Sequence, residues 1–156
     1  MEKHKKCAIF GHRTIEVTNE LKAIITDTLK NMIEKEFIFD FYFGGFGEFD
    51  NLCWQIVSNL RKSNTCVRRI FCLLDPKHKN PLKRPKWLNS DDYEEFICLD
   101  LDCDYWYTRI YYRNCEIINH SDYIIFYVKN NYGGAYKAMQ YAIKQNKPFV
   151  NIAILN

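Results

Sequence analysis

The most promising phosphate-binding groups lie in a glycine-rich segment, residues 44–50, which contains Gly44, Gly45 and Gly47. This segment joins a predicted strand to a predicted helix, so its backbone amides and the helix N-terminus can form a cradle for a phosphate. It matches neither the Gly-x-Gly-x-x-Gly dinucleotide fingerprint nor a P-loop, because no Gly-Lys-Ser/Thr sequence follows it. The segment therefore predicts phosphate binding without identifying the ligand.

Two carboxylates, Glu48 and Asp50, belong to the same segment. Phosphate would repel the Glu48 carboxylate unless this group contacts a ribose hydroxyl or takes part in chemistry, so Glu48 is a candidate ligand contact. Asp50 has a second interpretation as the N-cap of the following helix. In an enzyme that breaks an N-glycosidic bond, either carboxylate could act as nucleophile or stabilise a positively charged ribose. Glu48 and Asp50 are therefore the candidate catalytic residues.

Two further glycine sites follow other predicted strands. In the sequence Gly11-His12-Arg13, Arg13 can offer two parallel hydrogen bonds to a phosphate and His12 can donate one or titrate near neutrality. The alternative interpretation is a surface turn with solvated side chains. Gly133 and Gly134 begin a predicted helix, where they either expose free amides or allow close helix packing. Ligands of open α/β sheets bind at the carboxyl ends of the strands, so we expect the glycine sites to converge there.

Strand-like and helix-like segments alternate along the chain. Six strands are predicted, at residues 7–10, 37–43, 67–74, 93–101, 123–128 and 149–155. The alternation predicts one domain, residues 1–156, of the α/β class. We expect a Rossmann-like three-layer fold, with a mostly parallel central sheet flanked by helices.

The composition limits the class of function. The chain has 156 residues, of which 47% are hydrophobic and 16% aromatic, and its formal net charge is only +3. This charge predicts that nucleic acid is an unlikely partner. No apolar run approaches the roughly 20 residues that span a membrane, and no signal peptide is recognisable. We therefore expect a cytoplasmic protein without a membrane partner, and the many tyrosines and phenylalanines favour a homo-oligomer, either a dimer or a larger assembly.

Neither a metal nor a cofactor is predicted from the cysteines, histidines and acidic residues. The seven cysteines contain no Cys-x-x-Cys pair, which indicates reduced thiols and not a zinc site or a disulfide framework. The cluster Asp100, Asp102 and Asp104 lacks the glycine turn and the distal glutamate of a calcium loop. The basic segment 77–87 is either a solvated loop or a lid over an anionic ligand.

Three stretches resemble the SLOG superfamily, which is named from the DNA-processing protein Smf/DprA and the LOG cytokinin-activating proteins. They are a strand followed by Gly-His-Arg (7–13), a glycine loop leading to an acid (44–50), and a C-terminal block (113–136). The sequence is most similar to the small YpsA/YoqJ-like branch of bacteria and phages. The resemblance implies a Rossmann-like nucleotide-binding domain, often a dimer or larger. Related domains read NAD-derived cyclic ADP-ribose signals in antiphage systems.

The resemblance also implies a set of ligand-binding residues: Gly11, His12, Arg13, Gly44, Gly45, Gly47, Glu48, Asp50, Arg113, Asn114, Gly133 and Gly134. The sequence departs from the Gly-Gly-x-Gly-Thr-x-x-Glu motif of LOG hydrolases, because Glu48 occupies the threonine position and Asn51 stands three residues later. We therefore expect a protein that senses or sequesters ADP-ribose, cyclic ADP-ribose or another nucleotide, in phage–host defence. The alternative is an enzyme acting on N-glycosidic bonds, like a nucleoside monophosphate phosphoribohydrolase or a nucleoside deoxyribosyltransferase.

Overall fold

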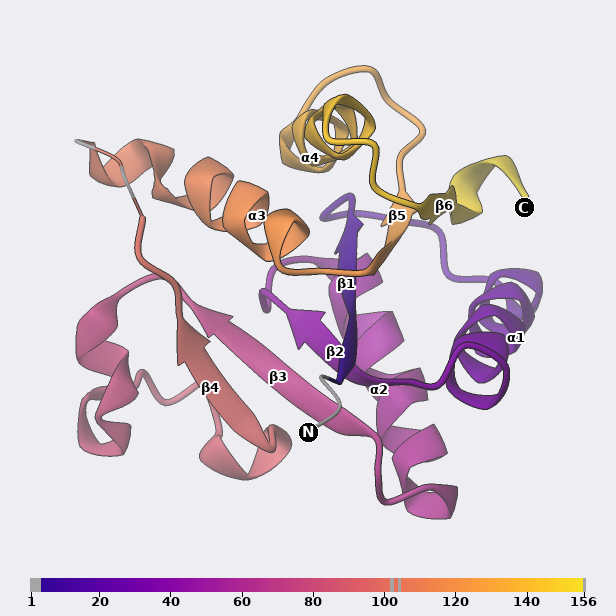
Figure 1. The fold of residues 1–156 in the computed structure, drawn as a ribbon, viewed down its shortest axis with the longest axis horizontal. Coiled ribbons are helices and arrows are strands. Elements are labelled where there is room, and N and C mark those ends of the chain that lie inside the picture. The colour runs from indigo at the N-terminus through magenta and orange to yellow at the C-terminus, as the bar shows by residue number, and fades with distance from the viewer. Residues whose placement is uncertain (1–3, 102, 104, 156) are drawn as a thin grey trace.

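The computed structural model describes residues 4–101, 103 and 105–155, and its strands form one six-stranded sheet. The strands are β1 (Lys5–Gly11), β2 (Ile38–Phe43), β3 (Arg68–Leu73), β4 (Glu95–Cys98), β5 (Tyr123–Tyr127) and β6 (Phe149–Asn151). Their order in the sheet is β4-β3-β2-β1-β5-β6, and every neighbouring pair is parallel. The prediction of a parallel α/β sheet is confirmed (Figure 1).

Two helices cover each face of this sheet. The described α-helices are α1 (Asn19–Glu34), α2 (Glu48–Ser63), α3 (Arg109–Asn119) and α4 (Gly134–Lys144). The apolar sides of α1 and α2 pack on one face, and those of α3 and α4 pack on the other. The fold therefore has the three layers that the alternation of elements predicts (Figure 1).

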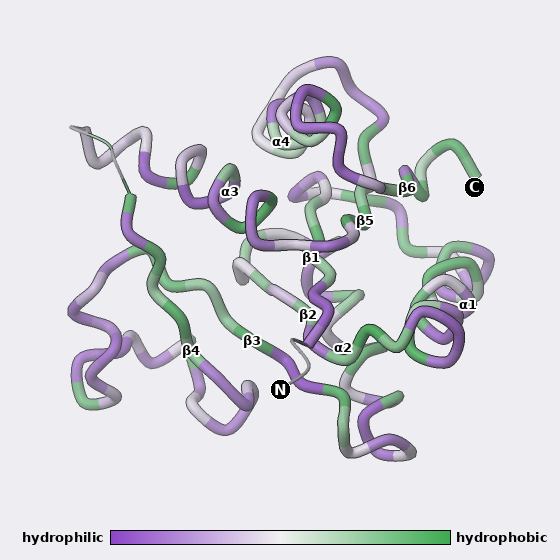
Figure 2. Tube along the Cα trace, viewed as in Figure 1, coloured by the Kyte–Doolittle hydropathy of each residue, from purple (hydrophilic) through white to green (hydrophobic). Residues whose placement is uncertain are grey.

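Residues of β1 alternate between the two layers of helices. Cys7 and Ile9 belong to the hydrophobic cluster that includes α1 and α2, whereas Ala8 belongs to the cluster that includes α3 and α4. Because successive side chains of a strand point to opposite faces, a sheet covered on both sides favours strands that are apolar along most of their length. The colouring of Figure 2 is hydrophobic along β4 and much of β3, and hydrophilic over most of the neighbouring segment 76–92.

Two predicted element boundaries are wrong. Helix α2 begins at Glu48 and its N-cap is Gly47, at a φ of 98°, so Asp50 is not the cap. The buried carboxylate of Asp50 instead accepts hydrogen bonds from the loop before the helix. The predicted last strand, 149–155, ends early because the side chain of Asn151 caps a 3₁₀ turn directly after β6.

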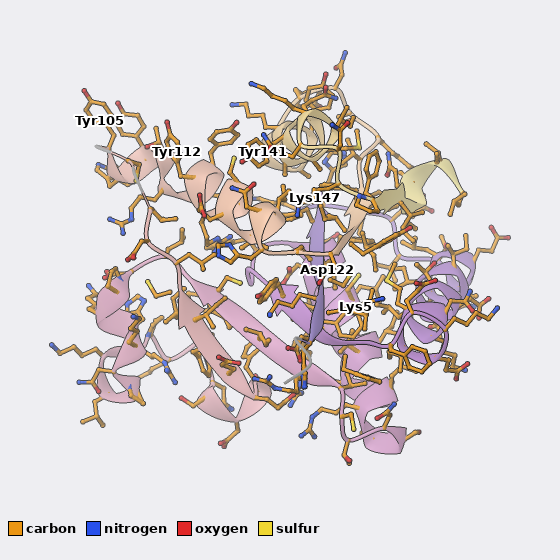
Figure 3. The ribbon with its side chains drawn as sticks, viewed as in Figure 1. Lys5, Tyr105, Tyr112, Asp122, Tyr141 and Lys147 are labelled. Atoms are coloured by element: carbon orange, nitrogen blue, oxygen red, sulfur yellow. The ribbon has the colours of Figure 1, made fainter. Side chains whose placement is uncertain are left out.

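Side chains near the C-terminal end of α4 hold the turn between α3 and β5. Lys147 donates from Nζ to the carbonyl oxygens of Asn119, at 3.2 Å, and Ser121, at 2.9 Å. The Tyr141 hydroxyl donates to Asn119 Oδ1 at 2.8 Å. Figure 3 shows Tyr141 and Lys147 close to this turn. Because these bonds fix the C-terminal end of α3, they also direct its N-terminal half toward the carboxyl ends of the strands.

Three sequence-based expectations concern disulfides, metal sites and membrane-spanning segments. All seven cysteines are described, and none forms a disulfide. Within the described ranges no group of three or more His, Cys, Asp or Glu residues could hold a metal ion; Asp102 and Asp104 lie outside those ranges. In the part of the chain that the structure describes, no helix is long and apolar enough to cross a membrane.

Gly11, the last residue of β1, is required by the packing of α2. A Cβ added there would lie 2.5 Å from Cβ of the buried Phe49. We expect Gly11→Ala to lower the free energy of unfolding by about 1–3 kcal/mol, because overpacking forces the helix or the strand to shift. Urea denaturation measures this change.

Gly134→Ala is the matched control, since a Cβ at Gly134 meets no atom within 4 Å. Alanine at this helical position should leave the stability unchanged or raise it slightly. Equal losses in the two variants would contradict the packing explanation.

Candidate ligand-binding site

A cavity of about 470 Å³, called the main cavity below, opens where the loops after β1, β2 and β5 meet the N-terminal half of α3. This is the volume of a typical small-molecule site. Nine of the twelve predicted site residues line it: Gly11, His12, Arg13, Gly44, Asp50, Arg113, Asn114, Gly133 and Gly134. The structure thus brings together residues that are separated by more than 120 positions in the sequence.

The order of the strands explains the position of this cavity. The chain leaves β1 for α1 on one face of the sheet, whereas it leaves the neighbouring β5 for α4 on the other face. The two connections therefore diverge and leave a crevice between them. Such a switch point is where open α/β sheets usually bind ligands.

Arg113 of α3 places a buried positive charge in the main cavity. Its side chain is nearly inaccessible, with the residue only 4% exposed. Nη1 donates to the carbonyl oxygens of Cys72, at 3.1 Å, and Gly44, at 3.4 Å, and Nη2 donates to Asn114 Oδ1 at 3.4 Å. Nε has no hydrogen-bond partner. Burial lowers the pKa of the guanidinium, yet an arginine remains charged in proteins.

No carboxylate within the described ranges lies within 4.0 Å of the Arg113 guanidinium. Buried charges in proteins are normally paired. The local backbone is adapted to this arginine, because a Cβ at Gly44 would lie 2.6 Å from Nη2. Gly44 is therefore needed for a close approach to Arg113, in addition to any role toward a ligand.

Asp50 is a second buried ionisable group that lines the main cavity. Its Oδ2 accepts from the Gly45 amide at 3.1 Å, and its Oδ1 accepts from the Gly44 amide at 3.4 Å. Burial raises the pKa of Asp50 to about 6, although the two amides and the charge of Arg113 oppose this shift. The carboxyl group can therefore change its charge close to neutral pH.

His12 connects the loops that follow β1 and β5. Its Nε2 accepts hydrogen bonds from the backbone amides of Lys129, at 2.9 Å, and Asn130, at 3.2 Å. This pairing requires a neutral ring with its proton on Nδ1, and burial lowers the pKa of His12 in the same direction. His12 thus fixes one wall of the main cavity through Nε2.

Glu48, Gly45 and Gly47 do not line the main cavity. The Glu48 carboxylate accepts from the backbone amide of Ile15 at 2.7 Å, and its own amide donates to the Arg13 carbonyl oxygen at 2.8 Å. These bonds hold the turn after β1 against the start of α2. Gly47 makes this contact possible, since a Cβ there would lie 2.7 Å from the Arg13 Cα.

The N-terminus of α4 contributes backbone donors. Gly133 is the N-cap, with a φ of 94°, and no side chain caps the helix. The first backbone bond at this end runs from the Lys137 amide to the Gly133 carbonyl oxygen, so the preceding amides have no partner within the helix. A Cβ at Gly133 or Gly134 would meet no atom within 4 Å. This open space faces the main cavity, which both glycines line.

Several cavity residues were not predicted from the sequence. Phe46, Tyr42, Ile110, Ile117 and Tyr132 also line the main cavity. Phe46 lies between the predicted glycines and Tyr132 directly precedes Gly133, so their positions could have indicated them. The two isoleucines show only helical spacing in α3, which is equally typical of core residues.

The exposed aromatic residues before α3 belong to neither the core nor the main cavity. Tyr105 is 59%, Trp106 81% and Tyr107 64% exposed, and none of them lines the cavity. Figure 3 shows Tyr105 and Tyr112 projecting away from the sheet. The structure therefore places residues 105–107 outside the hydrophobic core.

Solved structures with a similar fold bind different partners. DNA processing protein A from Streptococcus pneumoniae aligns with 94% of this chain at a TM-score of 0.62 and 12% identity, and this chain spans about half, 49%, of that protein. The same protein from Helicobacter pylori, described with a single-stranded DNA binding mode, has a TM-score of 0.60 and 19% identity. The alignment covers 93% of this chain and 63% of that protein. The molybdenum cofactor binding protein from Rippkaea orientalis has a TM-score of 0.58 and 17% identity. The alignment covers 96% of this chain and 76% of that protein.

These neighbours correct one expectation from the sequence. The low net charge of +3 led us to treat nucleic acid as an unlikely partner, but a fold of this kind is compatible with single-stranded DNA binding in the Helicobacter pylori protein. Net charge is therefore a poor reason to exclude nucleic acid for this fold.

No protein-family model matches the chain, and no curated protein sequence matches it. The assignment to the YpsA/YoqJ-like branch stays a prediction. The fold itself is the SLOG-type, Rossmann-like fold of DNA processing protein A and the molybdenum cofactor binding proteins, as the resemblance implied.

Proposed function

We propose that this chain binds a nucleotide-derived, phosphate-bearing small molecule in the main cavity, without converting it. The observation that carries this proposal is the buried guanidinium of Arg113, which lines the cavity and has an unpartnered Nε. An arginine presents planar, paired donors that match the geometry of a phosphate. A bound phosphate would supply the negative charge that no described carboxylate supplies at contact distance.

The opposite wall favours the same ligand chemistry. The unpaired amides at the start of α4 and the positive end of its dipole stabilise an anion. Arg13, which is exposed, lines the same cavity and adds a second guanidinium at its entrance. Asp50 opposes an anion when ionised, but its raised pKa reduces its charge as the pH falls toward 6.

Comparison with known structures supports a small-molecule site in this fold, because proteins from Rippkaea orientalis and Chlamydomonas reinhardtii with the same architecture bind the molybdenum cofactor. The ligand class that we propose is ADP-ribose, cyclic ADP-ribose or another nucleotide. With the sequence resemblance to the YpsA/YoqJ-like branch, this ligand class favours a sensor or sequestering role in phage–host defence.

One observation favours a second candidate function, the cleavage of an N-glycosidic bond. Asp50 is a buried carboxylic acid in the cavity, with a pKa raised to about 6, and such perturbed acids are common in active sites. In this reaction, water would add to the anomeric carbon while the bond to the base nitrogen breaks, and the base would leave with a proton. Release of free base from a bound nucleoside monophosphate, abolished in Asp50→Asn, would favour this function over binding alone.

Replacement of Arg113 tests the proposed binding function. We expect Arg113→Met to weaken the binding of ADP-ribose by about 10- to 100-fold, because it removes the charge-assisted hydrogen bonds to phosphate. Isothermal titration calorimetry measures this change for a panel of ADP-ribose, cyclic ADP-ribose, nucleoside monophosphates and a single-stranded oligonucleotide. Circular dichroism checks that the variant is folded.

Arg13→Gln is a second variant that leaves the buried contacts of Arg113 intact. It should weaken the binding of ADP-ribose several-fold, since Arg13 is exposed and lines the main cavity. Unchanged affinity in both variants, or binding of the oligonucleotide alone, would contradict the proposal.

The raised pKa of Asp50 predicts a pH-dependent stability. The pKa is about 6 in the folded chain and near 3.8 ordinarily, so the folded state binds this proton more tightly. Protonation of Asp50 therefore stabilises the folded state. This contribution is fully present below pH 3.8 and is lost as the pH rises through 6. Asn cannot titrate, so only the native chain should lose this stability as the pH rises. From pH 4 to pH 8, the unfolding free energy of Asp50→Asn should therefore rise by about 1–3 kcal/mol relative to that of the native chain.

Urea denaturation at several pH values measures this difference. Asn also changes the hydrogen bonds to Gly44 and Gly45, but that effect does not depend on pH and cancels in the comparison. Parallel stability profiles for the two proteins would show that Asp50 does not titrate in this range.

A further inference from the structure

A second cavity, of about 190 Å³, lies beside the main cavity and has aromatic walls. Its lining includes Trp54 of α2 together with Trp87 and Tyr93 from the segment between β3 and β4. Asp50 lines both cavities, so the two spaces meet at this side chain. None of the aromatic wall residues was predicted as part of the site.

One wall of this second cavity is held in a fixed orientation. The indole Nε1 of Trp54 donates to the Asp92 carbonyl oxygen at 3.1 Å. The Arg69 guanidinium carbon lies 5.4 Å from the centre of the Trp54 ring, and the ring of Tyr93 lies 6.3 Å away, centre to centre. Both Trp54 and Tyr93 are therefore positioned by contacts within the protein itself.

Trp87, which also lines the second cavity, is largely exposed. It is 62% exposed, whereas the adjacent Leu88 is buried. Its ring nevertheless has defined neighbours, because Phe46 and Phe71 lie at centroid distances of 6.4 and 6.3 Å. Trp87 thus presents a positioned aromatic surface to solvent, which is an arrangement suited to stacking on a planar group.

The glycine loop lies between the two cavities and contributes residues to the lining of both. Gly45 and Gly47 line the second cavity, and both adopt positive φ angles, 77° and 98°. A Cβ added at Gly45 would lie 2.6 Å from the Phe71 ring and 3.7 Å from the Trp87 ring, so glycine lets the loop pack against these aromatic side chains. Phe46, between the two glycines, lines the main cavity and contacts Trp87. The loop therefore connects the phosphate-binding wall with the aromatic wall.

We propose that the second cavity binds the base of the nucleotide, with the base stacked on Trp87 and the phosphate held at Arg113. This inference rests on the proposed function and narrows the preferred ligand to nucleotides that keep an aromatic base, which should bind more tightly than sugar phosphates. Asp50, Asn51 and Asp92 also line this cavity, and their side chains carry polar groups that can contact amino groups of the base or ribose hydroxyls.

The test compares adenosine monophosphate with ribose 5-phosphate, which lacks only the base. We expect the native chain to bind adenosine monophosphate at least about 10-fold more tightly than ribose 5-phosphate, because stacking of a base on an aromatic side chain raises the affinity by about this factor. Trp87→Ala should remove most of this advantage and leave the affinity for ribose 5-phosphate unchanged. Trp87→Phe, which keeps an aromatic ring, should restore most of it.

Trp106→Ala is the matched control, since Trp106 is also exposed but lines neither cavity. It should leave both affinities unchanged. Equal affinities of the two ligands for the native chain would overturn the base site while leaving the proposed function intact. An equal loss of both affinities in Trp87→Ala would also overturn the base site, because Trp87 would then act on the fold or on the phosphate site. If neither ligand binds at millimolar concentration, the proposed function fails and this inference fails with it.

Discussion

The neighbouring strands β1 and β5 lead to helices on opposite faces of the sheet, and this single constraint places the candidate site. Their connections diverge at the carboxyl edge, and no arrangement of short loops could close the space between them. His12 bridges this divergence by accepting from two amides after β5. The side chains that follow β1, the glycines that begin α4 and the buried face of α3 therefore meet in one cavity.

Within that cavity the burial of Arg113 shapes its surroundings. Its guanidinium binds carbonyl oxygens at the ends of β2 and β3, which fixes the height of α3 above the sheet. Only glycine fits at position 44 beside it. Asp50 binds the amides of the same loop from the other side. The glycine loop is therefore held between the buried Asp50 carboxyl group and the buried Arg113 guanidinium, and both residues line the cavity.

Periodicity and glycine positions were enough to predict the parallel three-layer fold and the part of the main cavity that follows β1, β2 and β5, because buried strands and their C-terminal turns have strong local signals. Arg113 and Asn114 were predicted only from the resemblance to the SLOG superfamily. Periodicity and glycine positions did not predict the roles of side chains whose positions depend on contacts between residues distant in the sequence. Asp50 looks like a helix cap in sequence, but its carboxylate reaches back to the loop. Glu48 holds the backbone of Ile15, which is distant in sequence. Trp87 lies in a basic, proline-containing segment whose packing against Phe71 has no periodic signal.

The most direct test of the account is a crystal structure of this chain with the nucleotide that binds most tightly. We expect a phosphate oxygen within about 3 Å of Arg113 and of an amide at the start of α4, as is usual for charge-assisted hydrogen bonds. A nucleotide bound elsewhere, for example in the cavity beside Lys5 at the amino ends of the strands, would contradict binding at the switch point.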